Sequence, residues 1–102
     1  MPEKRVVERV REIAERTLGR GDRHVHLAFR LRERGGEHEW REVFTVARSE
    51  VEPSTWGLFD EDDTFLWAMG FAGEPDWTDF AEGLVWAVEL YTEGEALDVE
   101  QV

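Results

Sequence analysis

The chain has 102 residues and no cysteine, a length that fits one domain and a composition that excludes a disulfide framework, a thiolate metal site and a cysteine nucleophile. All twelve Lys and Arg residues lie before residue 49, whereas residues 49–102 hold fifteen Asp and Glu and no cation. A region of that sign attracts cationic partners and repels nucleic acid and anionic lipid, so neither direct nucleic-acid binding nor membrane binding is expected.

Residues 3–18 have the pattern of an amphipathic helix. Val6, Val10, Ile13 and Leu18 recur at helical spacing, and Gly19 follows as a stop signal. No apolar stretch at this end resembles a signal peptide, and none elsewhere is long enough to span a bilayer. These features favour a cytoplasmic protein.

Residues 24–48 predict a β-hairpin that turns at Gly35-Gly36. A two-residue loop there pairs residues whose numbers sum to 71, so that apolar side chains of both strands share one face. Glu42 is the misfit on that face. A carboxyl buried there would have a raised pKa and the properties of a general acid. The favoured interpretation is instead an edge-strand or rim position, or a partner such as Arg30 or Arg41 reached around the strand.

An apolar strand is expected over residues 64–72, after a short strand at 56–59 and an acidic turn at 60–63. Strict alternation places four bulky side chains on one face of the longer strand and small residues on the other, as in a strand covered on both sides. The bulky residues are Phe65, Trp67, Met69 and Phe71.

Gly73 and Pro75 end this strand, and Asp76 has the position of an N-cap for a helix over residues 77–93. Residues 95–102 are expected to form a tail or a short edge strand. The prediction is therefore a single small α+β domain over residues 1–102. It comprises an N-terminal helix, an antiparallel β-meander of three to four strands and a C-terminal helix in αβββα order, with both helices on one face.

Metal and cofactor sites find little support in the sequence. His24 and His26 share a strand face and are the weak candidates for a zinc or nickel site, but a third ligand is missing and arginines lie nearby. The run Asp60-Glu61-Asp62-Asp63 fails as an EF-hand loop because Phe65 occupies the position that requires glycine. No bound metal or other cofactor is expected.

The polar face of the hairpin carries four arginines, and they invite a nucleic-acid-binding hypothesis. These residues are Arg30, Arg32, Arg34 and Arg41. The face has no interleaved aromatic residues, and glutamates lie beside it. We therefore expect cross-strand ion pairs, with Arg32 joined to Glu39 and Arg34 to Glu37.

The acidic half holds nine of the twelve aromatic residues, so it is expected to fold rather than form a tail. We expect the acidic turn and the outer face and end of the second helix to bind a partner through their carboxylates. The candidate residues are Asp60, Glu61, Asp62, Asp63, Asp79, Glu82, Glu89 and Glu93. An acidic surface without a partner, kept for solubility or a high-salt habitat, is the alternative.

No catalytic motif is present, so a non-enzymatic role is expected. The favoured hypothesis is an inhibitor that occupies a basic, nucleic-acid-binding surface of another protein, as a nucleic-acid mimic. Its size and charge are similar to those of small acidic anti-restriction and anti-CRISPR proteins, antitoxins and nuclease immunity proteins, without any shared motif. The alternatives are a dimeric structural or chaperone-like protein and a metal-dependent enzyme or ligand binder built on His24 and His26.

Overall fold

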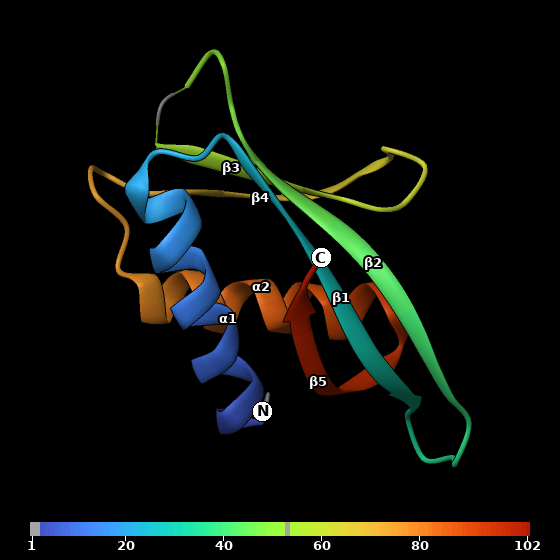
Figure 1. Ribbon diagram of the computed structural model, residues 1–102. Coiled ribbons are helices and arrows are strands. Elements are labelled where there is room, and N and C mark those ends of the chain that lie inside the picture. The colour runs from blue at the N-terminus through green and yellow to red at the C-terminus, as the bar shows by residue number, and fades with distance from the viewer. Residues whose placement is uncertain (1–2, 53) are drawn as a thin grey trace.

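This computed structural model describes residues 3–52 and 54–102 of the chain. They form a five-stranded antiparallel sheet and two α-helices (Figure 1). The elements are α1 (Lys4–Thr17), β1 (His24–Glu33), β2 (Glu39–Arg48), β3 (Thr55–Phe59), β4 (Phe65–Gly70), α2 (Trp77–Thr92) and β5 (Gly94–Gln101). A short 3₁₀ turn, Leu18–Arg20, follows α1. The α+β class is confirmed, with more strands than the sequence predicted.

One strand of the sheet is β5, which covers most of residues 95–102; of the two alternatives expected there, a tail or a short edge strand, the edge strand is the one observed. The strand order is β4-β3-β2-β1-β5, so β5 returns across the molecule to pair with β1 (Figure 1). A β-bulge opposite Arg30 and Leu31 interrupts the pairing. The αβββα order is therefore corrected to αββββαβ, and the edges of the sheet are β4 and β5.

The hairpin of β1 and β2 has the predicted register. Val25 lies opposite Val46 and Leu27 opposite Phe44, so both strands turn their apolar side chains to the same face. Phe29 and Phe44 are fully buried and contact each other edge to face, with ring centroids 5.9 Å apart. This face forms the centre of the core.

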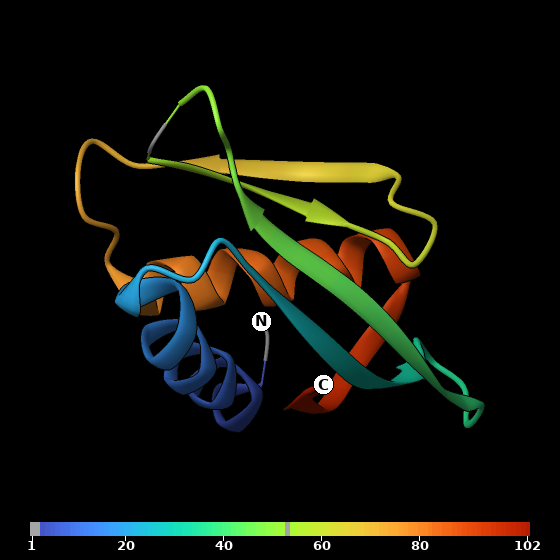
Figure 2. The same cartoon turned by 45° about the horizontal axis from the view of Figure 1, so that its top comes forward.

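Both helices cover that same face of the sheet (Figure 2). α1 buries Val6, Val10 and Ile13, and the middle of α2 buries Phe80 and Leu84. On the opposite face of β1, His24, His26 and Arg30 are exposed, and neither helix covers this side of the sheet (Figure 2).

Asp76 caps α2 as the sequence predicted. Its Oδ1 accepts hydrogen bonds from the amides of Thr78 at 2.9 Å and Asp79 at 3.2 Å. A cap of this kind stabilises a helix by about 1 kcal/mol. It fixes where α2 begins, and therefore which of its residues face outward.

The predicted alternation in β4 is wrong at Phe65. A β-bulge between Leu58 and Phe59 of β3 shifts the register, so that Trp67 lies opposite Leu58 while Phe65 lies opposite Phe59. Phe65 therefore leaves the helix-covered face and is 58% exposed, with its ring 5.7 Å from that of Phe59.

Candidate functional site

Two of the predicted partner-binding acids shape the turn between β3 and β4. Asp60 Oδ1 accepts hydrogen bonds from the amides of Asp62 and Thr64, both at 2.9 Å. Glu61 Oε1 accepts from the amide of Val43 at 3.1 Å and joins the turn to β2. The fold already uses these two carboxylates, so they are less available to a partner.

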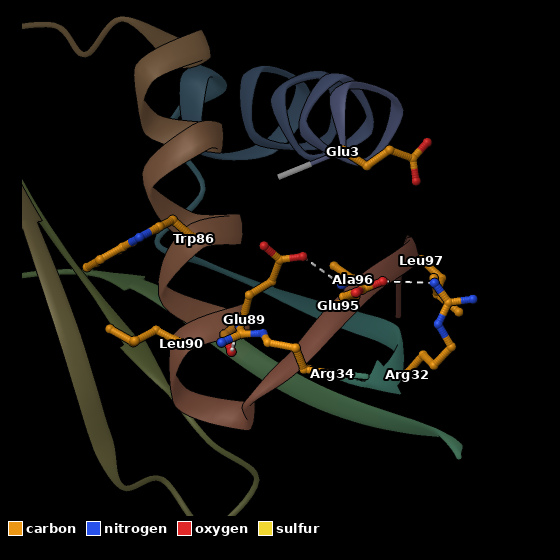
Figure 3. Close-up of a pocket in the computed structure, with 10 residues that line it drawn as sticks. Glu3, Arg32, Arg34, Trp86, Glu89, Leu90, Glu95, Ala96 and Leu97 are labelled. Atoms are coloured by element: carbon orange, nitrogen blue, oxygen red, sulfur yellow. Dashed lines mark hydrogen bonds and ion pairs between the residues drawn. The ribbon is translucent and has the colours of Figure 1, made fainter. Parts of the chain in front are cut away.

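Glu89 has a structural role that the sequence did not indicate. Its Oε2 accepts a hydrogen bond from the amide of Ala96 in β5 at 2.8 Å (Figure 3). In Figure 3 the Glu89 side chain reaches toward β5, whereas Trp86 and Leu90 project from the other side of α2. The carboxylate therefore satisfies a backbone N–H donor of the edge strand.

Other side chains form hydrogen bonds with further backbone groups of β5. Arg5 of α1 donates to the carbonyl of Leu97 at 2.9 Å, and Asp98 Oδ1 accepts from the amide of Val99 at 2.9 Å. A free strand edge is a template for pairing with another chain, and side chains that occupy its backbone groups prevent this. β5 is therefore a protected edge.

The other five predicted acids remain exposed. They are Asp62, Asp63, Asp79, Glu82 and Glu93. Within residues 3–52 and 54–102 their side chains take part in no hydrogen bond or ion pair. Asp79 and Glu82 lie on α2 and Glu93 is its C-cap residue, so the outer face and end of this helix concentrate negative charge that the fold does not compensate.

The exposed acids of α2 share one stripe with apolar residues. Asp79, Glu82, Trp86 and Leu90 recur at intervals of three and four, which places them along one side of the helix, and the C-cap residue Glu93 follows at its end. Trp86 is 50% and Leu90 is 57% exposed. The stripe therefore combines carboxylates with large apolar side chains in solvent.

β4 lies directly beside this stripe. A Cβ on Gly83 would lie 3.1 Å from the ring of Trp67 and 3.4 Å from the sulfur of Met69, so the absence of a side chain there allows β4 to approach α2. The rings of Trp67 and Trp86 are 6.2 Å apart. We call β4 together with this exposed stripe the β4–α2 surface.

The arginine face of the hairpin is neutralised largely by β5. The ion pairs are Arg30–Glu39 at 3.0 Å, Arg32–Glu95 at 2.8 Å and Arg41–Glu100 at 3.8 Å. Arg32 lies opposite Glu39 in the sheet as predicted, but the predicted ion pair between them is wrong, because the Arg32 guanidinium bonds to Glu95 of β5 instead. The hydrogen bond from Glu95 raises the pKa of Arg32 above its ordinary value, which keeps the guanidinium charged.

Arg34 turns to α2 instead of to Glu37. Its guanidinium donates to the carbonyl of Glu89 at 3.4 Å, at the rim of a cavity of about 650 Å³ between α2 and β5 (Figure 3). Such cations suit the negative end of a helix. Acidic and basic side chains line this cavity together, so it has no dominant charge with which to select a ligand.

The histidines and Glu42 do not form a reactive cluster. His26 Nδ1 lies 2.8 Å from the hydroxyl of Thr45, and its ring is 5.1 Å from that of His24. Among the described residues, no three His, Asp or Glu side chains come together as metal ligands. Glu42 is half-buried and accepts a hydrogen bond from the indole of Trp40 at 3.1 Å, rather than from an arginine.

Comparisons with known protein families, curated proteins and solved structures give no match for this chain. Neither helix in the described part of the chain combines the length and apolar character that crossing a bilayer requires. The geometry of the β4–α2 surface therefore carries the functional argument.

Proposed function

We propose that this protein is a non-enzymatic binding module that occupies a basic, nucleic-acid-binding surface of a partner protein. The observation that carries the proposal is the exposed stripe of α2, in which the carboxylates of Asp79 and Glu82 are followed by Trp86 and Leu90. The carboxylates attract a cationic surface, and the two apolar side chains add contact area that simple solubility does not require.

The distribution of charge supports the same proposal. Arg30, Arg32 and Arg41 of the hairpin have carboxylate partners from β2 and β5, whereas the carboxylates of Asp79 and Glu82 have no cation partner among the described residues. A cationic partner is therefore steered toward α2 rather than toward the sheet. Such steering gives fast association that weakens as salt screens the charges, and a partner held in this way cannot use the same cations for DNA or RNA.

A fluorescent arginine-rich peptide tests the proposal directly. Its affinity for the protein is measured at about 50 mM and about 300 mM salt, and it should fall by roughly tenfold or more between the two. The double variant Asp79→Asn, Glu82→Gln should bind about tenfold more weakly than the unaltered protein at the lower salt.

A matched control separates the β4–α2 surface from net charge. Glu12 and Glu37 are exposed and lie outside the surface, so Glu12→Gln, Glu37→Gln changes the net charge by the same amount. This control should bind the peptide within about twofold of the unaltered protein. Equal losses in the two double variants would refute a defined site, and no binding at either salt concentration would end the proposal.

A further inference from the structure

At the outer edge of β4, hydrogen bonds to β3 define which backbone groups face solvent. The amide of Phe71 donates to the carbonyl of Ser54 at 2.9 Å, whereas the carbonyl of Thr55 accepts from the amide of Ser49 on the other side of β3. Backbone groups alternate in direction along an antiparallel strand. Trp67 and Met69 therefore bond to β3, while Ala68 and Gly70 turn their N–H and C=O groups outward.

No part of the described chain closes this edge. Among residues 3–52 and 54–102, β3 is the strand neighbour of β4, and no side chain donates to or accepts from Ala68 or Gly70. Phe65–Gly70 also contains neither charge nor proline, the usual means by which proteins protect an edge strand. Ala68 and Gly70 are both exposed. The edge is therefore available to a further strand.

The position just outside β4 lies over the acidic stripe of α2. Trp67 and Met69 pack against Gly83, and Asp79, Glu82 and Trp86 lie one step further round the helix from that contact. Side chains of an added strand alternate between two faces, so every second one would point at these residues. Arginine or lysine at those positions would meet the two carboxylates, with its aliphatic stem against Trp86.

We propose that the partner binds by β-strand addition: an extended segment with Arg or Lys at alternate positions pairs with the outer edge of β4. This inference rests on the proposed function and specifies how the partner is held. Main-chain hydrogen bonds to Ala68 and Gly70 give the segment its register, and Asp79 and Glu82 select its charge.

A second copy of this chain fits the same edge less well. Two chains joined through β4 would bring two copies of Asp79 and Glu82 together, and each chain has a formal net charge of −12. Like charges across an interface oppose association. The negative charge of the chain therefore favours a basic partner over a dimer.

The probe is a synthetic peptide of about eight residues, roughly the length of a strand, in which arginine alternates with valine. Binding should slow hydrogen exchange of the Ala68 and Gly70 amides by about tenfold or more, as measured by NMR, because each gains a partner. The amides of Trp67 and Met69 are already bonded to β3 and should change little. Exchange at Ala68 and Gly70 that stays fast in the bound state would overturn the inference.

Ala68→Pro tests the edge on the protein side. Proline removes the outward N–H from a strand edge that tolerates it, and should weaken peptide binding by about tenfold. Ala68→Val keeps the N–H and should bind within about threefold of the unaltered protein. A peptide with the same sequence but N-methylated at every backbone amide keeps the charges and should also bind about tenfold more weakly. The N-methylated peptide tests strand addition even if Ala68→Pro does not fold.

The outcomes separate this inference from the proposed function. Salt-sensitive binding that neither Ala68→Pro nor N-methylation weakens would refute strand addition and leave the acidic surface as the site. Loss of all peptide binding would remove both. A dimer of the unaltered protein at pH 7 and low salt that Ala68→Pro dissociates would show that a second copy occupies the edge, and would overturn the choice of partner.

Discussion

The two edge strands of the sheet differ in whether side chains bond to their outward-facing backbone groups. On β5, Glu89 of α2, Arg5 of α1 and Asp98 of the strand itself occupy backbone groups that would otherwise face outward. On β4, Ala68 and Gly70 leave theirs open. α2 contacts both strands, so the difference lies in which side chains reach the backbone groups of each edge.

The acidic residues of α2 differ in the same way as the two edges. Glu89 and Glu82 lie on the same helix, yet one stabilises β5 and the other remains in solvent beside β4. An acid near the C-terminus of a helix opposes the helix dipole by about 0.3–1 kcal/mol. At Glu89 the hydrogen bond to Ala96 offsets that loss, whereas Glu82 makes no such bond, and a partner is the role we propose for it.

Proline at equivalent alanines should give the largest contrast between the edges. Ala96→Pro removes an amide that bonds to Glu89 and adds volume at a buried position, so unfolding free energy should fall by about 2–5 kcal/mol. Ala68→Pro removes an exposed amide without a bond and should cost less than about 1 kcal/mol. Urea denaturation followed by tryptophan fluorescence measures both. Similar losses would mean that β4 is not an open edge.

Truncation of Glu89 should have the next largest effect. Glu89→Ala leaves the Ala96 amide unpaired, at about 1–3 kcal/mol, while relief of the helix dipole offsets about 0.3–1 kcal/mol. A net loss of about 1–2 kcal/mol is expected from chemical denaturation. Glu89→Gln keeps an acceptor and should lose less than half of that. The control Glu82→Ala, on the exposed stripe, should stay within about 0.5 kcal/mol of the unaltered protein.

Amide exchange in the free protein should show the same contrast without any substitution. The amides of Ala96 and Val99 have side-chain acceptors, so they should exchange about tenfold more slowly than those of Ala68 and Gly70. NMR of the uniformly labelled protein measures all four. Equal rates at the two edges would contradict the assignment of outward groups on β4.

The sequence predicted the elements that depend on local patterns. The spacing of apolar residues in α1, the register of β1 and β2, and the cap at Asp76 all follow from periodicity and turn chemistry. The sequence left a tail and a short edge strand as alternatives for residues 95–102, because the bulge in β5 breaks the alternation of Ala96 and Val99 and the acidic residues resemble a solvated tail. Such a strand is specified by its pairing with β1, which is distant in sequence.

The same distinction between local pattern and distant pairing applies to the candidate site. The exposure of Asp79 and Glu82 follows from the helical stripe, so the sequence is sufficient to locate them. The bond from Ala96 to Glu89 and the outward exposure of Phe65 depend on bulges in two different strand pairs. The open edge of β4 also becomes apparent only when the strand order is known, because any of the strands is a possible edge until pairing is fixed.

Salt should have opposite effects on the two possible occupants of β4, and this is the smallest effect expected. Raising salt from about 0.1 M to about 1 M shortens the Debye length from about 10 Å to about 3 Å, which weakens repulsion between chains of net charge −12. Weak, reversible self-association with a dissociation constant of about 1 mM should then become measurable by light scattering, and Ala68→Pro should prevent it. Binding of the basic peptide should fall over the same range.

Association of Ala68→Pro equal to that of the unaltered protein would move the contact to another exposed surface, such as Phe59 and Phe65 on the uncovered face of the sheet. Charge would then protect that face rather than the edge.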